Sequence, residues 1–322
     1  MNKALIAGIN NYSFSPLFGC VNDAKALSEV IMRNGDGSLN MEVALHTNIA
    51  EKSTLRKLIR DFFRGGSGIS LFYFSGHGYV DSFGGMIVTP DASSYDEGIP
   101  MNEILEIANS SPATDRIIIL DCCYAGSIGD FSSRGGTNIS IMDGVTILTS
   151  SRAYEPAMEK AGHGVFTSLL LQALRGGAAD IRGYISPGSI YAYIDQALGN
   201  LGQRPVFKTN ISHFVALRAV VPQLPGNVLR KITDHFPAID DRHQLDPSHE
   251  YSNTPNFKPL LKKPFAVRKN VAVLKELQQM QSVGLVVPVD AEYMYFAAMN
   301  EKSCELTPLG KHYWKLVKEN KF

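Results

Sequence analysis

The chain reads ISLFYFSGHG over residues 69–78 and IIILDCCYAG over residues 117–126. Each stretch begins with a mostly apolar run and ends in polar or reactive side chains followed by glycine. Short runs of this kind are typical of strands buried on both faces of a sheet. We therefore expect two buried strands, one ending near His77 and the other near Cys122 and Cys123.

Apolar runs alternate with amphipathic stretches through the first two thirds of the chain. Further strands are expected at residues 4–9, 145–148 and 213–217. Apolar residues spaced by three and four predict helices at residues 22–32, 53–63, 101–108, 165–174 and 189–198. The alternation indicates an α/β fold with a mostly parallel sheet flanked by helices. Such sheets bind ligands beyond the carboxyl ends of their strands, so the functional site is expected there.

Composition and charge exclude several classes of protein. The chain has 322 residues, 44% of them hydrophobic, so it can form a substantial core. Lys plus Arg and Asp plus Glu both total 31, so no net charge draws the chain to nucleic acid or a membrane. No apolar run could span a bilayer, and the start of the chain is too short and polar for a signal peptide. The four cysteines show no disulfide or zinc spacing, which favours a reducing, cytoplasmic location.

The pattern changes near residue 219. Seven prolines fall between residues 221 and 264, which predicts a linker or an irregular cover over residues 219–260. Beyond it the sequence predicts a helix at 267–283, a hairpin made of 284–287 and 293–296, and a last helix that begins with Thr307 as its N-cap. This order suggests a small α+β module of winged-helix type over residues 261–322.

His77 and Cys123 carry the chemical signal. A cysteine nucleophile needs a base within hydrogen-bond reach, and a histidine on the neighbouring strand can supply it. A histidine alone would more often be structural. A histidine and a cysteine that are each flanked by glycine at a strand end favour a nucleophilic site, because glycine lets backbone N–H groups approach a ligand closely.

Four motifs resemble those of the caspase-like cysteine peptidases, most of all the metacaspases and their short prokaryotic relatives. They are YFSGHG at residues 73–78, LDCCYAG at 120–126, GCVNDA at 19–24, and LTSSR at 148–152 followed by GVFT at 164–167. His77 precedes Cys123 by 46 residues. The resemblance implies a caspase-like peptidase domain over residues 1–218.

The resemblance and the strand period together select the nucleophile. If the strand keeps its period of two through residue 123, Asp121 and Cys123 share a face and Cys122 points away from it, which favours a core position for Cys122. The family nucleophile is the cysteine two residues after this aspartate, which is Cys123. The expected mechanism is attack by the Cys123 thiolate, proton transfer by His77, and stabilisation of the oxyanion by the backbone N–H groups of Gly78 and Cys123. Where metacaspases usually carry His-Ser, this chain has Tyr124-Ala125.

Carboxylates near the nucleophile suggest a preference for basic substrates. Asp121 would be a poor activator of a neighbouring thiol, because its charge disfavours the thiolate. By resemblance, Cys20, Asp23, Ser75 and Asp121 match the metacaspase S1 pocket, which accepts Arg or Lys. The alternative for Asp23 is a helix N-cap or an acid in the first turn of a helix.

Other residues have less specific interpretations. Asp81, Asp91, Asp96 and Glu97 are scattered, which disfavours a calcium site without deciding calcium dependence, and no metal or cofactor is assigned. His163 is expected to be structural. Arg134 is either solvated on a loop or a site of self-cleavage.

The predicted function is a cytoplasmic cysteine endopeptidase that cleaves proteins or peptides after Arg or Lys, as a regulated effector in stress, antiviral defence or cell death. Residues 261–322 hold 10 basic and 6 acidic side chains, too small an excess for a typical DNA-binding face. This module is expected to bind a small-molecule or protein activator, or only to pack on the peptidase. The alternatives are a non-catalytic caspase-like scaffold and a winged-helix regulator that binds nucleic acid.

Overall fold

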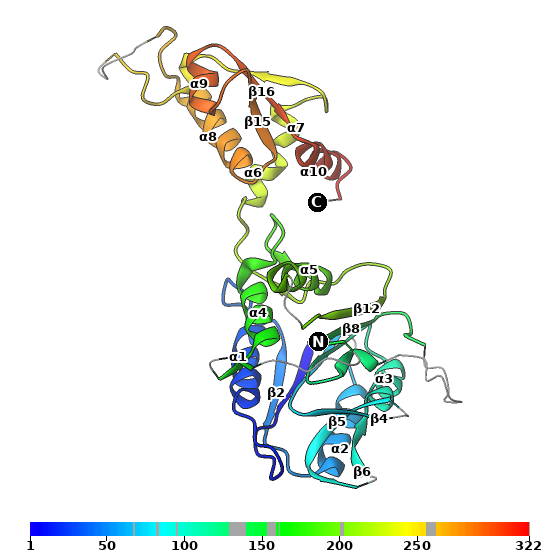
Figure 1. Ribbon diagram of the computed structural model, residues 1–322. Coiled ribbons are helices and arrows are strands. Elements are labelled where there is room, and N and C mark those ends of the chain that lie inside the picture. The colour runs from blue at the N-terminus through cyan, green and yellow to red at the C-terminus, as the bar shows by residue number, and fades with distance from the viewer. Residues whose placement is uncertain are drawn as a thin grey trace. The chain divides into compact units, whose positions relative to one another are not determined.

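The computed structural model describes residues 1–66, 68–81, 84–94, 96–128, 140–152, 159–160, 162–199, 203–255 and 262–321 (Figure 1). The chain forms two compact units, Met1–Val221 and Pro222–Phe322. Each unit has its own sheet and its own helices.

The first unit is built on a six-stranded sheet with the order β12-β8-β7-β3-β1-β2. Five strands are parallel, and the edge strand β12 runs antiparallel to β8. The bounds are β1 Lys3–Gly8, β2 Glu42–Thr47, β3 Ile69–Ser75, β7 Asp115–Asp121, β8 Val145–Thr149 and β12 Val206–Asn210. Every residue of β3, β7 and β8 is buried, as their apolar runs predicted. The expectation of a mostly parallel sheet is confirmed.

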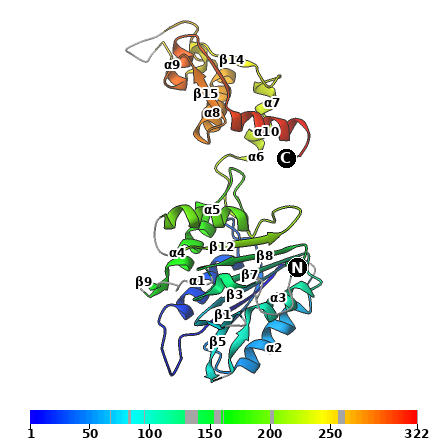
Figure 2. The same cartoon turned by 45° about the vertical axis from the view of Figure 1, so that its right-hand side comes forward.

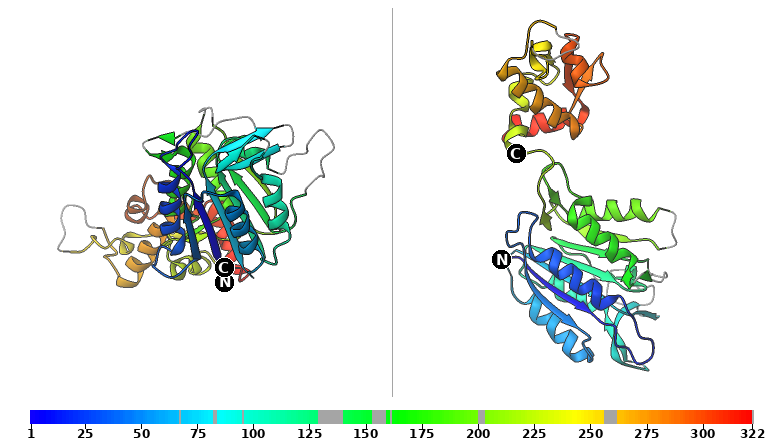
Figure 3. Two further views of the ribbon diagram at one scale, coloured as in Figure 1. Left: turned by 90° about the horizontal axis from the view of Figure 1, so that it is seen from below. Right: turned by 90° about the vertical axis from the view of Figure 1, so that its left-hand side faces the viewer.

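Helices cover both faces of this sheet (Figure 2). Helices α1 (Cys20–Met32), α4 (Val165–Gln172) and α5 (Pro187–Leu198) form one core layer with alternate strand residues such as Tyr73 and Ile119. Helices α2 (Lys52–Phe63) and α3 (Met101–Asn109) form the other layer with Leu120 and Cys122. The right-hand view of Figure 3 looks onto the face that α1 covers. Successive residues at the end of β7 therefore point into different layers.

Shorter elements complete the first unit. A three-stranded antiparallel sheet, β4 Gly78–Asp81, β5 Gly84–Ser93 and β6 Asp96–Pro100, follows β3 directly. The remaining elements are η1 Ala125–Ser127, β9 Glu159–Lys160, β10 His163–Gly164, the π-helical turn η2 Ala173–Gly177, β11 Tyr184–Ile185 and β13 Arg218–Ala219. The strand expected at residues 213–217 is wrong. The antiparallel strand is β12 at Val206–Asn210, whose half-exposed edge position gives it a mixed sequence without an apolar run.

The second unit combines helices with the antiparallel sheet β14-β16-β15. Its elements are α6 Gly226–Arg230, α7 Ile232–His235, β14 Arg242–Gln244, η3 Pro247–His249, α8 Arg268–Ser282, β15 Val286–Val289, α9 Met294–Met299, β16 Ser303–Leu306 and α10 Pro308–Lys318. The helix predicted at 267–283 is α8. The predicted cap of the last helix is also present, because Thr307 Oγ1 accepts a hydrogen bond from the Gly310 N–H at 3.0 Å.

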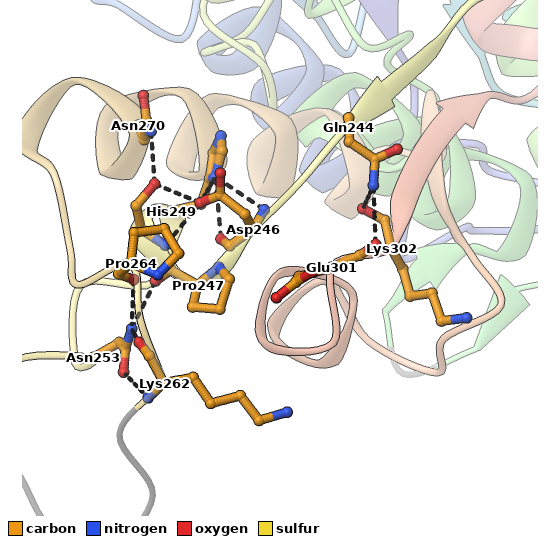
Figure 4. A network of polar contacts seen from close by, with 11 residues as sticks. Gln244, Asp246, Pro247, His249, Asn253, Lys262, Pro264, Asn270, Glu301 and Lys302 are labelled. Carbon is orange, nitrogen blue, oxygen red and sulfur yellow. Dashed lines mark hydrogen bonds and ion pairs between the residues drawn. The ribbon is translucent and has the colours of Figure 1, made fainter.

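Residues 222–255 belong to this second unit, so the linker interpretation of this segment is wrong. The segment buries Leu229, Phe236 and Leu245. Asn253 ties it down through hydrogen bonds from Nδ2 to three carbonyl oxygens, of Pro247 at 3.0 Å, Lys262 at 2.7 Å and Pro264 at 3.1 Å (Figure 4). Prolines interrupt the periodicity of the sequence here without preventing the segment from packing.

The hairpin expected between residues 284–287 and 293–296 is also wrong. The strand β15 pairs with β16, and the apolar run at 293–296 enters helix α9 instead. Met294, Ala297 and Ala298 are buried at helical spacing. A four-residue apolar run fits a strand or one turn of a helix equally well, and here tertiary packing selects the helix.

Candidate active site

The two motif-bearing strands end side by side. Ser75 and Asp121 are the last residues of β3 and β7 and are paired in the sheet register. The Gly76 N–H donates to the Asp121 carbonyl oxygen at 3.4 Å. His77 and Cys123 follow these two residues by two positions each, at the same carboxyl edge.

The adjacent cysteines have different surroundings. Cys122 is 1% exposed in the core layer that contains Leu120, and burial raises the pKa of its thiol well above the usual range. Its carbonyl oxygen accepts hydrogen bonds from the hydroxyls of Ser150 at 3.3 Å and Ser151 at 3.1 Å. Cys123 is half-buried. Of the two thiols, the one buried in the core is unsuited to nucleophilic attack.

Gly78 makes a close approach that a side chain would block. A Cβ atom at this position would lie 2.0 Å from the carbonyl oxygen of Cys123 and 3.2 Å from Cys122 Sγ. Only glycine therefore fits where the backbone after β3 meets the backbone after β7. The close approach places the peptide groups of Gly78 and Cys123 next to one another.

The imidazole of His77 is held by the loop after β1. Its Nε2 lies 2.7 Å from the Ser15 carbonyl oxygen, which can only accept, so Nε2 carries a proton and donates it. The His77 backbone N–H donates to Tyr12 Oη at 3.1 Å, and that hydroxyl donates to the Val88 carbonyl oxygen at 3.0 Å. The Tyr12 ring also packs edge-on against the imidazole, with 4.5 Å between centroids. The sequence did not predict the contacts of His77 with Ser15 and Tyr12. They join positions 62 and 65 residues apart, and a backbone carbonyl has no signature in a sequence.

Asp121 lies in a buried polar cluster on the α4 side of the sheet. It is 6% exposed, and Thr167 Oγ1 donates to its Oδ2 at 2.6 Å. Thr167 also bonds to Tyr73 Oη at 2.6 Å. Burial raises the pKa of Asp121 to about 6, against the opposing effect of the Thr167 hydrogen bond. The carboxyl group therefore ionises close to neutral pH.

Asp23, in the first turn of α1, completes this cluster. It is 1% exposed and accepts hydrogen bonds from the Gly164 N–H at 2.8 Å and from His163, whose Nδ1 lies 2.7 Å from Oδ1. A Cβ atom at Gly164 would lie 2.6 Å from Asp121 Oδ2 and 3.1 Å from Asp23 Oδ2. The two carboxylates thus converge on a glycine. We call Asp23, Asp121, His163, Thr167 and Tyr73 the acidic cluster.

The other residues of the predicted substrate pocket are close to these elements in the fold. Ser75 is 1% exposed at the end of β3, and Cys20 is 4% exposed at the start of α1. Sequence reasoning placed Asp23, Asp121, Ser75 and Cys20 in one pocket but gave His163 a structural role and did not include Thr167 or Tyr73. The signal for Thr167 was its place in the GVFT motif.

The scattered acids of the small sheet have partners of their own. Asp91 accepts hydrogen bonds from the Lys52 N–H at 3.0 Å and from Thr89 Oγ1 at 2.6 Å, and Asp96 forms an ion pair with the Lys52 side chain. Within the described ranges, no three His, Cys, Asp or Glu side chains are grouped so as to hold a metal ion. Arg134, considered as a self-cleavage site, lies outside the described residues.

Comparisons with known proteins agree with this architecture. The chain is similar to a protein from Geobacter sulfurreducens, with 16% identity and a TM-score of 0.52 over 69% of this chain and 97% of the other. It is also similar to caspase-1 from Spodoptera frugiperda, with 14% identity and a TM-score of 0.50 over 68% of this chain and 90% of the other. These likenesses show the fold.

A search of curated proteins found no match. In the part of the chain that the structure describes, no helix is long and apolar enough to cross a membrane. The family model of the caspase domain matches residues 1–214, which is about two thirds of the chain and includes both strand-end motifs. The chain therefore belongs to the caspase-domain family, a family of cysteine peptidases.

Proposed function

We propose that this chain is a cysteine endopeptidase that uses Cys123 and His77 and cleaves after Arg or Lys. The observation that carries the proposal is the acidic cluster, in which two buried carboxylates converge at Gly164 and one of them, Asp121, precedes Cys123 by two residues. Family membership supports the reaction class, and the cluster supports the choice of a cationic side chain.

The hydrogen bonds of His77 to Ser15 and Tyr12 support the proposed mechanism. The Nε2–H group of His77 donates its hydrogen bond to the Ser15 carbonyl oxygen. The other nitrogen of the neutral ring, Nδ1, can therefore accept the thiol proton of Cys123. The thiolate attacks the scissile carbonyl carbon, and the backbone N–H groups of Gly78 and Cys123 stabilise the oxyanion. His77 then gives its proton to the departing amine, which leaves a thioester on Cys123. A water molecule hydrolyses the thioester and restores the thiol.

The proposed specificity follows from the energetics of buried charge. Asp121 and Asp23 are nearly inaccessible to water and converge at Gly164, so holding both of them ionised is costly even with the hydrogen bonds that they accept. A guanidinium or ammonium group in the substrate would offset this cost, and a guanidinium can form two parallel hydrogen bonds to a carboxylate. A neutral side chain at P1, the residue before the scissile bond, would bring no positive charge to the two carboxylates.

The test is cleavage of internally quenched peptides that differ only at P1, with Arg, Lys, Asp or Ala, each with and without calcium. We expect cleavage after Arg and Lys at least about a hundredfold faster than after Ala, with no requirement for calcium. Efficient cleavage after Asp with none after Arg would contradict the proposed specificity. No binding and no cleavage of any peptide would favour the non-catalytic scaffold.

We further propose that the second unit regulates the peptidase by binding an activator. Tyr293, Tyr295 and Phe296 at the start of α9 are 55%, 40% and 44% exposed and contact one another, which supports a role in recognition. Truncation after Val221 should give either constitutive activity or an enzyme that no longer responds to its trigger. A truncated protein that matches the full chain in basal and stimulated cleavage would contradict this role.

Cytoplasmic location, winged-helix character and a function in stress, antiviral defence or cell death remain predictions from the sequence. Nucleic-acid binding by the second unit is the alternative to activator binding. Binding of duplex DNA that weakens steeply with added salt would favour that alternative.

A further inference from the structure

A second recess lies beside His77, separate from the acidic cluster. It is an open pocket with a volume of about 550 Å³. The residues that line it include Phe14, His77, Tyr79, Val88, Ala92 and Ser93. Gly78, Ser94 and Glu97 complete the lining, so the wall comes from the loop after β1, the segment after β3, and β4, β5 and β6.

The pocket and the acidic cluster lie on different sides of the sheet. Val88, in the pocket wall, packs in the core layer that holds Leu120 and Cys122. Tyr73, which bonds to Thr167 in the acidic cluster, packs in the opposite layer with Ile119. His77 follows the end of β3, between these layers, and forms one wall of the pocket.

The pocket has the surface chemistry of an apolar binding site. Phe14 and Tyr79 are 55% and 43% exposed, although aromatic side chains of this size are usually buried. The Phe14 ring lies 5.6 Å from the His77 ring, between centroids. Ala92 and the largely buried Val88 add aliphatic groups, while Ser93, Ser94 and Glu97 add two hydroxyl groups and a carboxylate at the rim. The volume falls within the range typical of ligand pockets and is large enough for one or two side chains.

The reaction chemistry determines which part of a substrate meets this pocket. His77 must give its proton to the departing amine, so that nitrogen lies at the imidazole when the bond breaks. The P1 side chain of the same substrate is directed to the acidic cluster, on the other side of His77. The chain that follows the scissile bond therefore begins beside the wall that His77 contributes to the pocket.

We infer that this pocket is a subsite for a bulky apolar or aromatic side chain in one of the first two positions after the scissile bond, P1′ or P2′. The inference rests on the proposed function, because it takes His77 as the proton donor. It adds a second determinant of specificity, which selects the residues on the leaving side of the substrate, after the scissile bond, by their size and apolar contacts.

The experiment uses quenched peptides that share one sequence through P1 and carry Gly-Gly, Leu-Gly, Gly-Leu, Phe-Gly or Gly-Phe after it. With the full-length protein, we expect the best of the Leu or Phe peptides to have a kcat/KM roughly tenfold above that of the Gly-Gly peptide. Ala92→Trp fills the pocket and should reduce this ratio to within about twofold of unity.

Phe14→Ala should also lower the ratio, because it removes one aromatic wall. Its matched control is Phe214→Ala, since Phe214 is exposed to the same degree, 56% against 55%, and does not line the pocket. The control should keep the wild-type ratio. A ratio of two peptides on one enzyme cancels any general loss of activity caused by disturbing His77.

Equal kcat/KM values for all five peptides, or an undiminished preference in Ala92→Trp, would overturn the inference. Cleavage after Arg without any preference on the leaving side would reject the subsite and keep the proposed function. Cleavage after a residue other than Arg or Lys, with the preference for Leu or Phe after the scissile bond intact, would reject the proposed P1 specificity and keep the subsite. If the enzyme is idle, binding of the same intact peptides to Cys123→Ala gives the comparison without turnover, and equal affinities would again reject the subsite.

Discussion

The two sides of His77 differ in how they would select a substrate. On one side, Asp23 and Asp121 are almost completely buried, and each accepts hydrogen bonds of 2.6–2.8 Å. On the other side, Phe14 and Tyr79 stand exposed around an open pocket. The loss of a positive charge opposite a desolvated carboxylate is penalised heavily, whereas a lost apolar contact is penalised mildly. We therefore expect steep selection before the scissile bond and shallow selection after it.

The largest expected effect is the loss of activity when the proposed nucleophile Cys123, which serves both sides, is replaced. Cys123→Ala should lower kcat/KM for every peptide by at least about a thousandfold, because the attacking thiolate is lost. Cys122→Ala should keep most of the activity and lose about 1 kcal/mol of unfolding free energy from the core. Both are measured by cleavage assays and denaturant titration. An inactive Cys122→Ala together with an active Cys123→Ala would show that Cys122 is the nucleophile and that the assignment of Cys123 from the strand period is wrong.

The next effect tests the acidic side. Asp121→Asn should lower kcat/KM for Arg peptides by about a hundredfold, mainly through KM, while leaving the ratio between leaving-side peptides unchanged. Asp115→Asn is the matched control. Asp115 is also a buried acid of β7, with its pKa raised by burial, but it lies at the opposite end of the strand. Equal losses of activity in the two variants would mean that Asp121 acts only through folding.

The raised pKa of Asp121 predicts a pH dependence for activity and an opposite one for stability. The carboxyl group has a pKa of about 6 in the folded chain against the ordinary aspartate value of 3.8, so kcat/KM for Arg peptides should rise as the pH increases through 6. The stability contributed by its protonated form is full below pH 4 and is lost as the pH rises through 6. At pH 8, Asp121→Asn should therefore be more stable than the wild type by about 2–3 kcal/mol. Urea titrations at pH 4, 6 and 8 would measure this, and a variant less stable at pH 8 would contradict it.

These predictions concern residues that differ in how far the sequence alone reveals them. The mostly apolar runs of β3 and β7 predict buried strands, and a period of two continued past the end of β7 at Asp121 predicts that Cys122 is separated from Asp121 and Cys123. The contacts of Asp23 with Gly164 and of Asp121 with Thr167 join segments 141 and 46 positions apart, so composition and periodicity could not reveal them. The motif resemblance brought Asp23 and Asp121 together but did not identify their hydrogen-bond donors.

The second unit was harder to predict for a different reason. Its strands have three or four residues, too few to show a period, and its first 34 positions are interrupted by prolines. Asn253 holds that segment through hydrogen bonds to carbonyl oxygens, which have no sequence pattern. The long helix α8 and the capped helix α10 were predicted because their signals are local.

The smallest expected effect concerns the support of His77, which both sides share. Tyr12→Phe removes the hydroxyl that accepts from the His77 N–H and donates to the Val88 carbonyl oxygen. Leaving these two buried backbone groups without their partner should lower the free energy of unfolding by about 1–3 kcal/mol. The hydrogen bond from Nε2 to Ser15 remains, so kcat should fall only by about three- to tenfold.

Because the imidazole serves every substrate, the loss in Tyr12→Phe should be the same for all P1 and leaving-side peptides. Steady-state kinetics on both peptide series would measure it, with Tyr184→Phe as a control for the same substitution at a surface position. A loss confined to peptides with Leu or Phe after the scissile bond would show that Tyr12 supports the pocket through Val88 and not the alignment of His77. A loss confined to Arg peptides would mean that the loop after β1 shapes the acidic side, and the separation of the two sides would then fail.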